Sequence, residues 1–144
     1  MILTDDQAMI RDMARRFASE RLAPQSAEWD RTKHFPRAEI AELGALGMLG
    51  MLVPEAYDGA EVDHISYALA LEEVAAGNGA VSTIMSVHNS VGCAPILKFG
   101  NEDQKQQFLR PMARGEKLGA FCLTEPQAGS DASALKTRAR RPNS

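Results

Sequence analysis

The hydrophobic pattern of the chain changes at Gly115, and this change constrains the fold more than any other feature. Before Gly115, apolar residues recur at the 3.6-residue spacing of amphipathic helices. After it, residues 118–123 form a short apolar run that is typical of a buried strand, and Pro126 prevents that strand from continuing. Residues 135–141 alternate enough to form a second strand. The order is therefore helices first, then the beginning of a sheet.

This order predicts an all-α helical domain over residues 1–116, followed by the first strands of an incomplete β-domain over residues 117–144. Hydrophobic residues make up 44% of the chain and charged residues 24%, as in soluble globular proteins. The net charge of −3 provides no field suited to nucleic acid. One basic cluster is expected on a solvated strand face, and it consists of Lys136, Arg138, Arg140 and Arg141.

Capping residues and prolines set the limits of the expected helices. Thr4 with Gln7, and Asn101 with Gln104, have the spacing of a capping box. Pro24 is expected to bend the first helix without ending it. Five helices are expected, over about residues 4–33, 36–47, 63–77, 80–98 and 101–111. The last of them is expected to bury Phe108 and Leu109 until Pro111 interrupts it.

No Asp, Glu, Lys or Arg occurs between Glu73 and Lys98. Eleven polar, glycine or proline residues in this window make it too polar for a lipid-exposed span, so a helix buried inside the protein is expected instead. The N-terminus lacks the basic and apolar regions of a secretory signal. We therefore expect a cytoplasmic protein with reduced thiols and no membrane span.

The spacing of the ionisable side chains predicts neither a catalytic nor a metal centre. His88 has no Glu or Cys at ligand spacing, which favours a hydrogen-bonded structural histidine. Glu72 and Glu73 diverge around their helix, so they are expected to form ion pairs or to face solvent. Cys122 is expected to fill the core, and neither a metal site nor a Ser/His/Asp arrangement is predicted.

Residues 123–131 read Leu-Thr-Glu-Pro-Gln-Ala-Gly-Ser-Asp and are followed by Leu-Lys-Thr at 135–137. This stretch resembles the first signature of the acyl-CoA dehydrogenases, flavoenzymes that introduce a trans double bond into an acyl-CoA thioester. Four further stretches also resemble family positions, at residues 53–60, 67–73, 88–90 and 98–100.

The resemblance implies FAD as cofactor, an acyl-CoA substrate from fatty-acid or branched-chain catabolism, an electron-transfer flavoprotein as electron acceptor, and a homo-oligomer. In the family a helical domain precedes a β-domain and a C-terminal helical bundle, which holds the catalytic glutamate. The chain thus corresponds to the N-terminal portion of such an enzyme. No catalytic residue is assigned in it, and it is expected to be inactive alone.

The resemblance also assigns roles to particular residues. Phe121, Leu123 and Thr124 are candidates for contacts with the flavin, with Leu123 and Thr124 on opposite faces of the strand. Gly129, expected to provide backbone angles that other residues avoid, and Ser130 are candidates for contacts with cofactor phosphate or the thioester part of the substrate. The alternative is an ordinary strand end, and Asp131 is expected to cap the turn.

The acyl tunnel of the family runs beside the uncharged helix. The expected wall comprises Thr83, Ile84, Val87 and Val91. These positions lie close to one helical face, and an ordinary core face is an equally good interpretation.

Two further alternatives stay open. The chain could be a non-catalytic helical interaction module, or a truncated gene product that retains the family core. An acyl-CoA oxidase or a nitroalkane-oxidising relative shares the architecture, and acyl chain length is only weakly encoded here.

Overall fold

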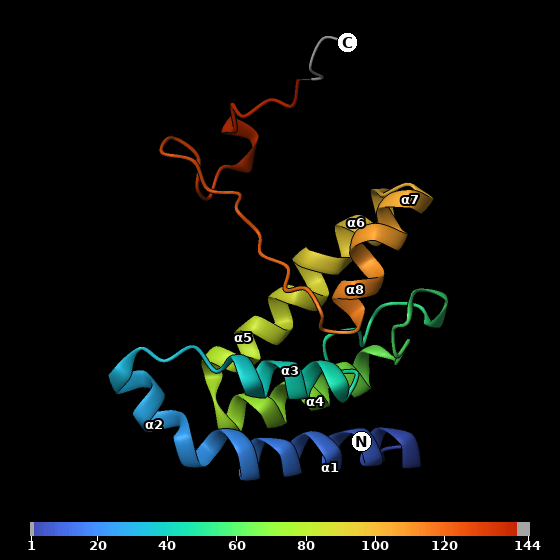
Figure 1. The fold of residues 1–144 in the computed structure, drawn as a ribbon, viewed down its shortest axis with the longest axis vertical. Helices are drawn as coiled ribbons and strands as arrows, with labels where there is room; N and C mark the ends of the chain where they lie inside the picture. The colour runs from blue at the N-terminus through green and yellow to red at the C-terminus, as the bar shows by residue number, and fades with distance from the viewer. Residues whose placement is uncertain (1, 141–144) are drawn as a thin grey trace.

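The structure is a computed structural model that describes residues 2–140, and it is helical up to residue 113 (Figure 1). The α-helices are α1 (Asp5–Phe17), α2 (Ala23–Thr32), α3 (Arg37–Ala45), α4 (His64–Gly77), α5 (Gly79–Val87), α6 (Ala94–Phe99), α7 (Glu102–Gln104) and α8 (Arg110–Ala113). The π-helical segments are η1 (Ala18–Leu22), η3 (His88–Cys93) and η4 (Lys105–Leu109), and the 3₁₀ turns are η2 (Glu55–Tyr57) and η5 (Ala132–Ala134). The π-helical segments join α1 to α2, α5 to α6 and α7 to α8 into longer helical runs.

Local signals set the helix limits as predicted. The Thr4 hydroxyl accepts the N–H of Gln7 at 3.2 Å, and the Gln7 side chain accepts the N–H of Thr4 at 3.1 Å. The box formed by Asn101 and Gln104 is also present. Pro24 lies in the first turn of α2, directly after η1, where its missing N–H is tolerated.

The core lies between α1, α4 and α5, with α3 and the loop after it packed on top. Helix α1 packs along α4, and α4 packs along α5. The buried residues of this cluster are Ala14, Phe17, Ala18, Leu22, Ile40, Leu43, Met48, Leu49, Met51, Ala70, Val74, Val81 and Met85. A second cluster lies around α8 and consists of Val53, Cys93, Leu109, Met112 and Ala113.

A contact between two glycines fixes where the chain leaves the helices. Gly115 has φ +73°, and a Cβ added to it would lie 2.7 Å from the Cα of Gly44 in α3. A side chain at either position would clash with the backbone of the other. The change of hydrophobic pattern at Gly115 therefore coincides with a turn that only glycine accommodates.

The two predicted strands are not formed. Within residues 118–140 the only sheet-like pairing is an isolated antiparallel bridge between Glu125 and Ala128. A strand needs a neighbouring strand to satisfy its backbone N–H and C=O groups, and the described residues offer none to 118–123 or to 135–140. Arg141 lies outside the described residues. The segment instead extends away from the helices (Figure 1).

Three side-chain predictions near this end of the chain are also wrong. Phe108 is 41% exposed, although Leu109 beside it is buried. Pro111 does not interrupt the helix: η4 shifts the register, so that Pro111 lies in the first turn of α8 and is buried there. Cys122 is exposed rather than part of the core, because the sheet that would cover it is not formed.

The run Gly79–Phe99 is long and apolar enough to cross a membrane by length and composition alone, a test that core helices of soluble proteins also pass. Its middle carries two buried polar side chains. The amide of Asn89 donates to the carbonyls of Met48 and Met85 at 2.8 and 3.0 Å. The bond to Met48 ties the run to the loop after α3, but only 28% of the apolar window is buried within the described residues, so the prediction of a helix buried inside the protein is not confirmed.

Candidate functional site

Two candidate regions carry the predicted site residues, the segment after Gly119 and the outer face of α5 and η3. In the first, Leu123 and Thr124 line one pocket of about 310 Å³, together with Cys122, Glu125, Leu135 and Thr137. Because residues can line a pocket through their backbone as well as their side chains, the opposite facing of Leu123 and Thr124 stays a prediction. Phe121 is half exposed and does not line the pocket.

Glu125 closes the loop that follows Thr124. Its carboxylate accepts the backbone N–H groups of Lys136 and Thr137, each at 2.9 Å, and the Gln127 side chain also donates to it. Hydrogen bonds from the Thr137 side chain and from these backbone groups lower the pKa of Glu125 to about 2. Residues 125–137 thus form a compact loop with adjacent ends, a type of loop that is frequently functional. The sequence analysis missed this role of Glu125.

Gly129 and Ser130 lie exposed on this loop. Asp131 accepts the N–H of Ser133 at 3.0 Å, so it caps the turn as predicted. The backbone angle expected of Gly129 is not observed, because its φ is not positive: Asp131 and the bridge between Glu125 and Ala128 shape the turn instead. A Cβ added to Gly129 would meet no atom within 4 Å. Nothing in the packing of residues 2–140 requires a glycine there.

The second region is the face that carries the predicted tunnel wall. Thr83 is exposed, and its hydroxyl donates to the Gly79 carbonyl at 2.9 Å. Val87 is partly buried, Val91 is 36% exposed, and Ile84 packs against the edge of the core. Within the described residues this face is therefore only partly covered, and both interpretations of it stay open. The structure does not bring these side chains into one pocket with Leu123 and Thr124.

His88 is buried between the two regions. Its Nε2 lies 3.0 Å from the carbonyl oxygen of Met112, and its Nδ1 accepts the N–H of Gly119 at 3.1 Å. Burial lowers the pKa of His88 below its usual 6.5, and the Met112 carbonyl only partly opposes this. The prediction of a hydrogen-bonded structural histidine is confirmed. Its partners lie far away in sequence, and no local pattern indicated them.

The ion-pair prediction for the neighbouring carboxylates is also confirmed. Glu73 binds Arg15 at 2.6 Å, and Glu72 is exposed. In the part of the chain that the structure describes, no group of three or more His, Cys, Asp or Glu side chains could hold a metal ion.

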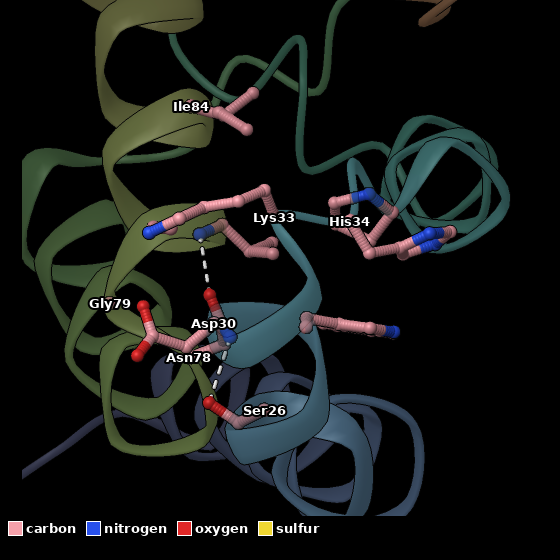
Figure 2. A pocket seen from close by; sticks show the side chains of 11 residues that line it. Ser26, Asp30, Lys33, His34, Asn78, Gly79 and Ile84 are labelled. Atoms are coloured by element: carbon pink, nitrogen blue, oxygen red, sulfur yellow. Dashed lines mark hydrogen bonds between the residues drawn. The ribbon is translucent and has the colours of Figure 1, made fainter.

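A pocket of about 460 Å³ lies between the end of α2 and the start of α5 (Figure 2). The Asn78 side chain caps α5 by accepting the N–H of Val81 at 2.9 Å, and it donates to Ser26 at 2.8 Å. Lys33 and His34 also line the pocket, but Ile84 is the only predicted site residue there. In the sequence, the Gly-Asn-Gly stretch at 77–79 indicates only a helix end.

Comparison with known proteins decides what kind of chain this is. The family model for the acyl-CoA dehydrogenase N-terminal domain matches residues 4–116. The chain belongs to the acyl-CoA dehydrogenase family. The predicted membership of this family is thereby confirmed, as is the helical N-terminal domain.

Known relatives and solved structures match nearly the whole chain. It is 46% identical over 143 residues to an acyl-CoA dehydrogenase of Bacillus subtilis, covering 99% of this chain and 38% of that protein. A solved structure of the electron transferring flavoprotein of Acidaminococcus fermentans aligns with TM-score 0.90 and 43% identity, covering 94% of this chain and 36% of that one. A glutaryl-CoA dehydrogenase of Mycobacterium smegmatis in complex with FADH2 aligns with TM-score 0.91 and 36% identity, covering 97% and 36%. The chain thus spans little more than a third of the length of these proteins.

Proposed function

We propose that the chain forms the N-terminal part of an FAD-dependent acyl-CoA dehydrogenase that carries out α,β-dehydrogenation of an acyl-CoA thioester in fatty-acid or branched-chain catabolism. In this proposal, residues 1–116 are the helical domain and residues 117–144 begin the β-domain. The observation that carries the proposal is the loop closed by Glu125. It presents Gly129, a glycine that the packing of the described residues does not require, next to the exposed residue Ser130.

The residues present fit a flavin. FAD, when bound, accepts the hydride from the β carbon of the substrate. Thr124 offers a hydroxyl beside the apolar Leu123 in one pocket, and Phe121 lies exposed nearby. A hydroxyl and backbone N–H groups can stabilise negative charge that develops on the polar edge of a ring. The open space at Gly129 lets a phosphate or thioester group approach the backbone, and Ser130 can donate to it.

The face of α5 and η3 suits an acyl chain. It is uncharged, and the wall residues Thr83, Ile84, Val87 and Val91 lie toward its outer side without being enclosed in the core. An acyl tail that covered these side chains would remove apolar surface from water.

One solved structure bears on the electron acceptor. Electron transfer to an electron-transfer flavoprotein accords with the Acidaminococcus fermentans structure that the chain resembles. A homo-oligomer, a cytoplasmic location and the absence of a membrane span stay predictions. They follow the family resemblance and the packing of Gly79–Phe99 into the helical domain.

The test uses a chimaera in which this chain replaces the matching 38% of the Bacillus subtilis relative. In it, Thr124→Val should weaken FAD retention or slow flavin reduction, and Ser130→Ala should weaken cofactor or acyl-CoA affinity. Each change would leave a polar group of the bound ligand without its partner, which costs about 1–3 kcal/mol once the ligand covers the site. Flavin absorbance and anaerobic flavin reduction measure both effects. Thr32→Val and Ser19→Ala, whose hydroxyls bind only helix carbonyls, are the matched controls.

Thr124→Val and Ser130→Ala should both leave the melting temperature of the apoprotein nearly unchanged, since neither residue is buried in the described chain. Wild-type flavin content and reduction rate together with early melting would show that these residues are structural. In that case the proposed roles of Thr124 and Ser130 are wrong.

Val87→Phe in the same chimaera should shorten the preferred acyl chain. Extra volume on the tunnel wall leaves less room for the substrate tail, and a few methylenes in an apolar pocket change efficiency by about 10-fold or more. The ratio of kcat/KM for butyryl-CoA to that for octanoyl-CoA is the measurement, and Met9→Phe on the exposed side of α1 is the control. An unchanged ratio would place the tunnel elsewhere.

A further inference from the structure

His88 connects the two regions that the proposed function uses. It follows Val87 of the proposed acyl wall directly, and its side chain is 1% exposed. The N–H of Gly119 can only donate, so Nδ1 must accept, and the neutral ring carries its proton on Nε2, toward the carbonyl of Met112. Both ring nitrogens are therefore engaged, and the ring has a single fitting tautomer and orientation.

The bond from Gly119 to His88 is the attachment point of the extended segment. Among the hydrogen bonds within residues 2–140, it alone joins residues 118–140 to the helices. The backbones also approach closely there. A Cβ added to Gly119 would lie 2.6 Å from the Met112 side chain and 3.3 Å from the Cα of Gly92 in η3. The start of the segment is thus held in one position against η3 and α8.

Beyond this point the segment lacks other polar anchors on the helices. From Gly119 to Thr124 an extended backbone reaches about 16 Å at its usual rise per residue. A small change of direction at Gly119 consequently moves Thr124 by a large distance relative to Val87.

We propose that His88 is a positioning residue: its bond to Gly119 sets the placement of the flavin-contacting segment relative to the acyl wall. This inference rests on the proposed function for its consequence in catalysis. Its geometric part concerns the chain alone. His88 touches neither cofactor nor substrate and acts only through Gly119.

Two substitutions separate the two bonds of the ring. In His88→Asn, the side-chain oxygen occupies nearly the position of Nδ1 and can still accept from Gly119, while the bond to Met112 is lost. In His88→Gln, the side-chain amide reaches toward Met112 and can still donate to it, while the bond from Gly119 is lost. Each variant leaves one partner unpaired, so the two are matched in their cost to stability.

The first measurement is amide hydrogen exchange of Gly119 in the 144-residue chain, followed by NMR. We expect His88→Asn to keep the protection of the Gly119 amide within about threefold of wild type. We expect His88→Gln to lose about tenfold or more of that protection, which corresponds to about 1.4 kcal/mol or more. Equal behaviour of the two variants, or the reverse order, overturns the inference.

Wild-type protein provides a check that needs no folded variant. A nitrogen–nitrogen coupling across the hydrogen bond should join the Gly119 amide to Nδ1, with the ring proton on Nε2. Absence of this coupling in the folded chain, or a proton on Nδ1, also overturns the inference.

The second measurement uses the chimaera. His88→Gln should slow flavin reduction by roughly tenfold or more, because misplacement by a fraction of an ångström to 1 Å is costly to a reacting pair. His88→Asn should keep the rate of flavin reduction near that of the wild-type chimaera. A wild-type chimaera without flavin would contradict the proposed function and leave the exchange result standing. A flavin-loaded chimaera with equal rates in both variants would contradict the role of His88 in positioning.

Discussion

Mixed with FAD and an acyl-CoA, the 144-residue chain alone is expected to show no α,β-dehydrogenation. Removal of the α proton requires a base whose pKa lies near the working pH. The one carboxylate that lines the pocket of Thr124 is Glu125, and its pKa of about 2 makes it a very weak base. Thr124, Ser130 and Val91 are exposed, so water has access to the groups that would orient the substrate.

Dye-reduction assays with butyryl-, octanoyl- and palmitoyl-CoA and added FAD measure this. Turnover above the protein-free control with any of the three substrates would show that the chain contains a base. A loss of that turnover in Glu125→Gln would identify the base as Glu125.

Gly59→Ala is expected to destabilise the helical domain by about 3 kcal/mol or more, because overpacking against backbone cannot be relieved by a rotamer change. A Cβ added to Gly59 would lie 1.9 Å from the carbonyl oxygen of Val53. That carbonyl also accepts the N–H of Glu61 at 3.0 Å, and the Val53 side chain is buried in the second core cluster. The loop must therefore open, and the cluster around α8 must move with it.

Urea unfolding followed by circular dichroism measures the effect. The matched control is Gly129→Ala, which meets no atom within 4 Å and should change the unfolding free energy by less than about 0.5 kcal/mol. Equal stabilities of the two variants would mean that the loop at Gly59 adapts without cost.

The helices could be predicted because their signals are local. The capping pairs Thr4 with Gln7 and Asn101 with Gln104, and the helix start near Pro36, each act within one turn of a helix. The π-helical segments were not predicted, and the error at Pro111 follows from one of them. Segment η4 shifts the helical register, which turns Phe108 outward and brings Pro111 to a position where a proline is tolerated.

The residue types of the candidate site could be predicted from the sequence motif, but their arrangement in space could not. Residues 123–131 identified the family, and Asp131 and His88 have the roles expected of them. The strand at 118–123 was wrong because pairing depends on residues distant in sequence. For the same reason no motif indicated the hydrogen bonds that Glu125 accepts from Lys136 and Thr137. The same holds for the hydrogen bond that His88 accepts from Gly119.

The measurement that tests the central claim most directly is anaerobic titration of the chimaera with acyl-CoA, with the flavin absorbance as readout. The claim is that residues 118–137 present a flavin- and thioester-binding segment beside an acyl-binding helix. It predicts a folded chimaera that retains FAD through purification and whose flavin bleaches on addition of butyryl-CoA or octanoyl-CoA. A chimaera with the helical content and melting behaviour of a folded protein, but without retained or reducible flavin, would contradict the claim and favour a non-catalytic helical module.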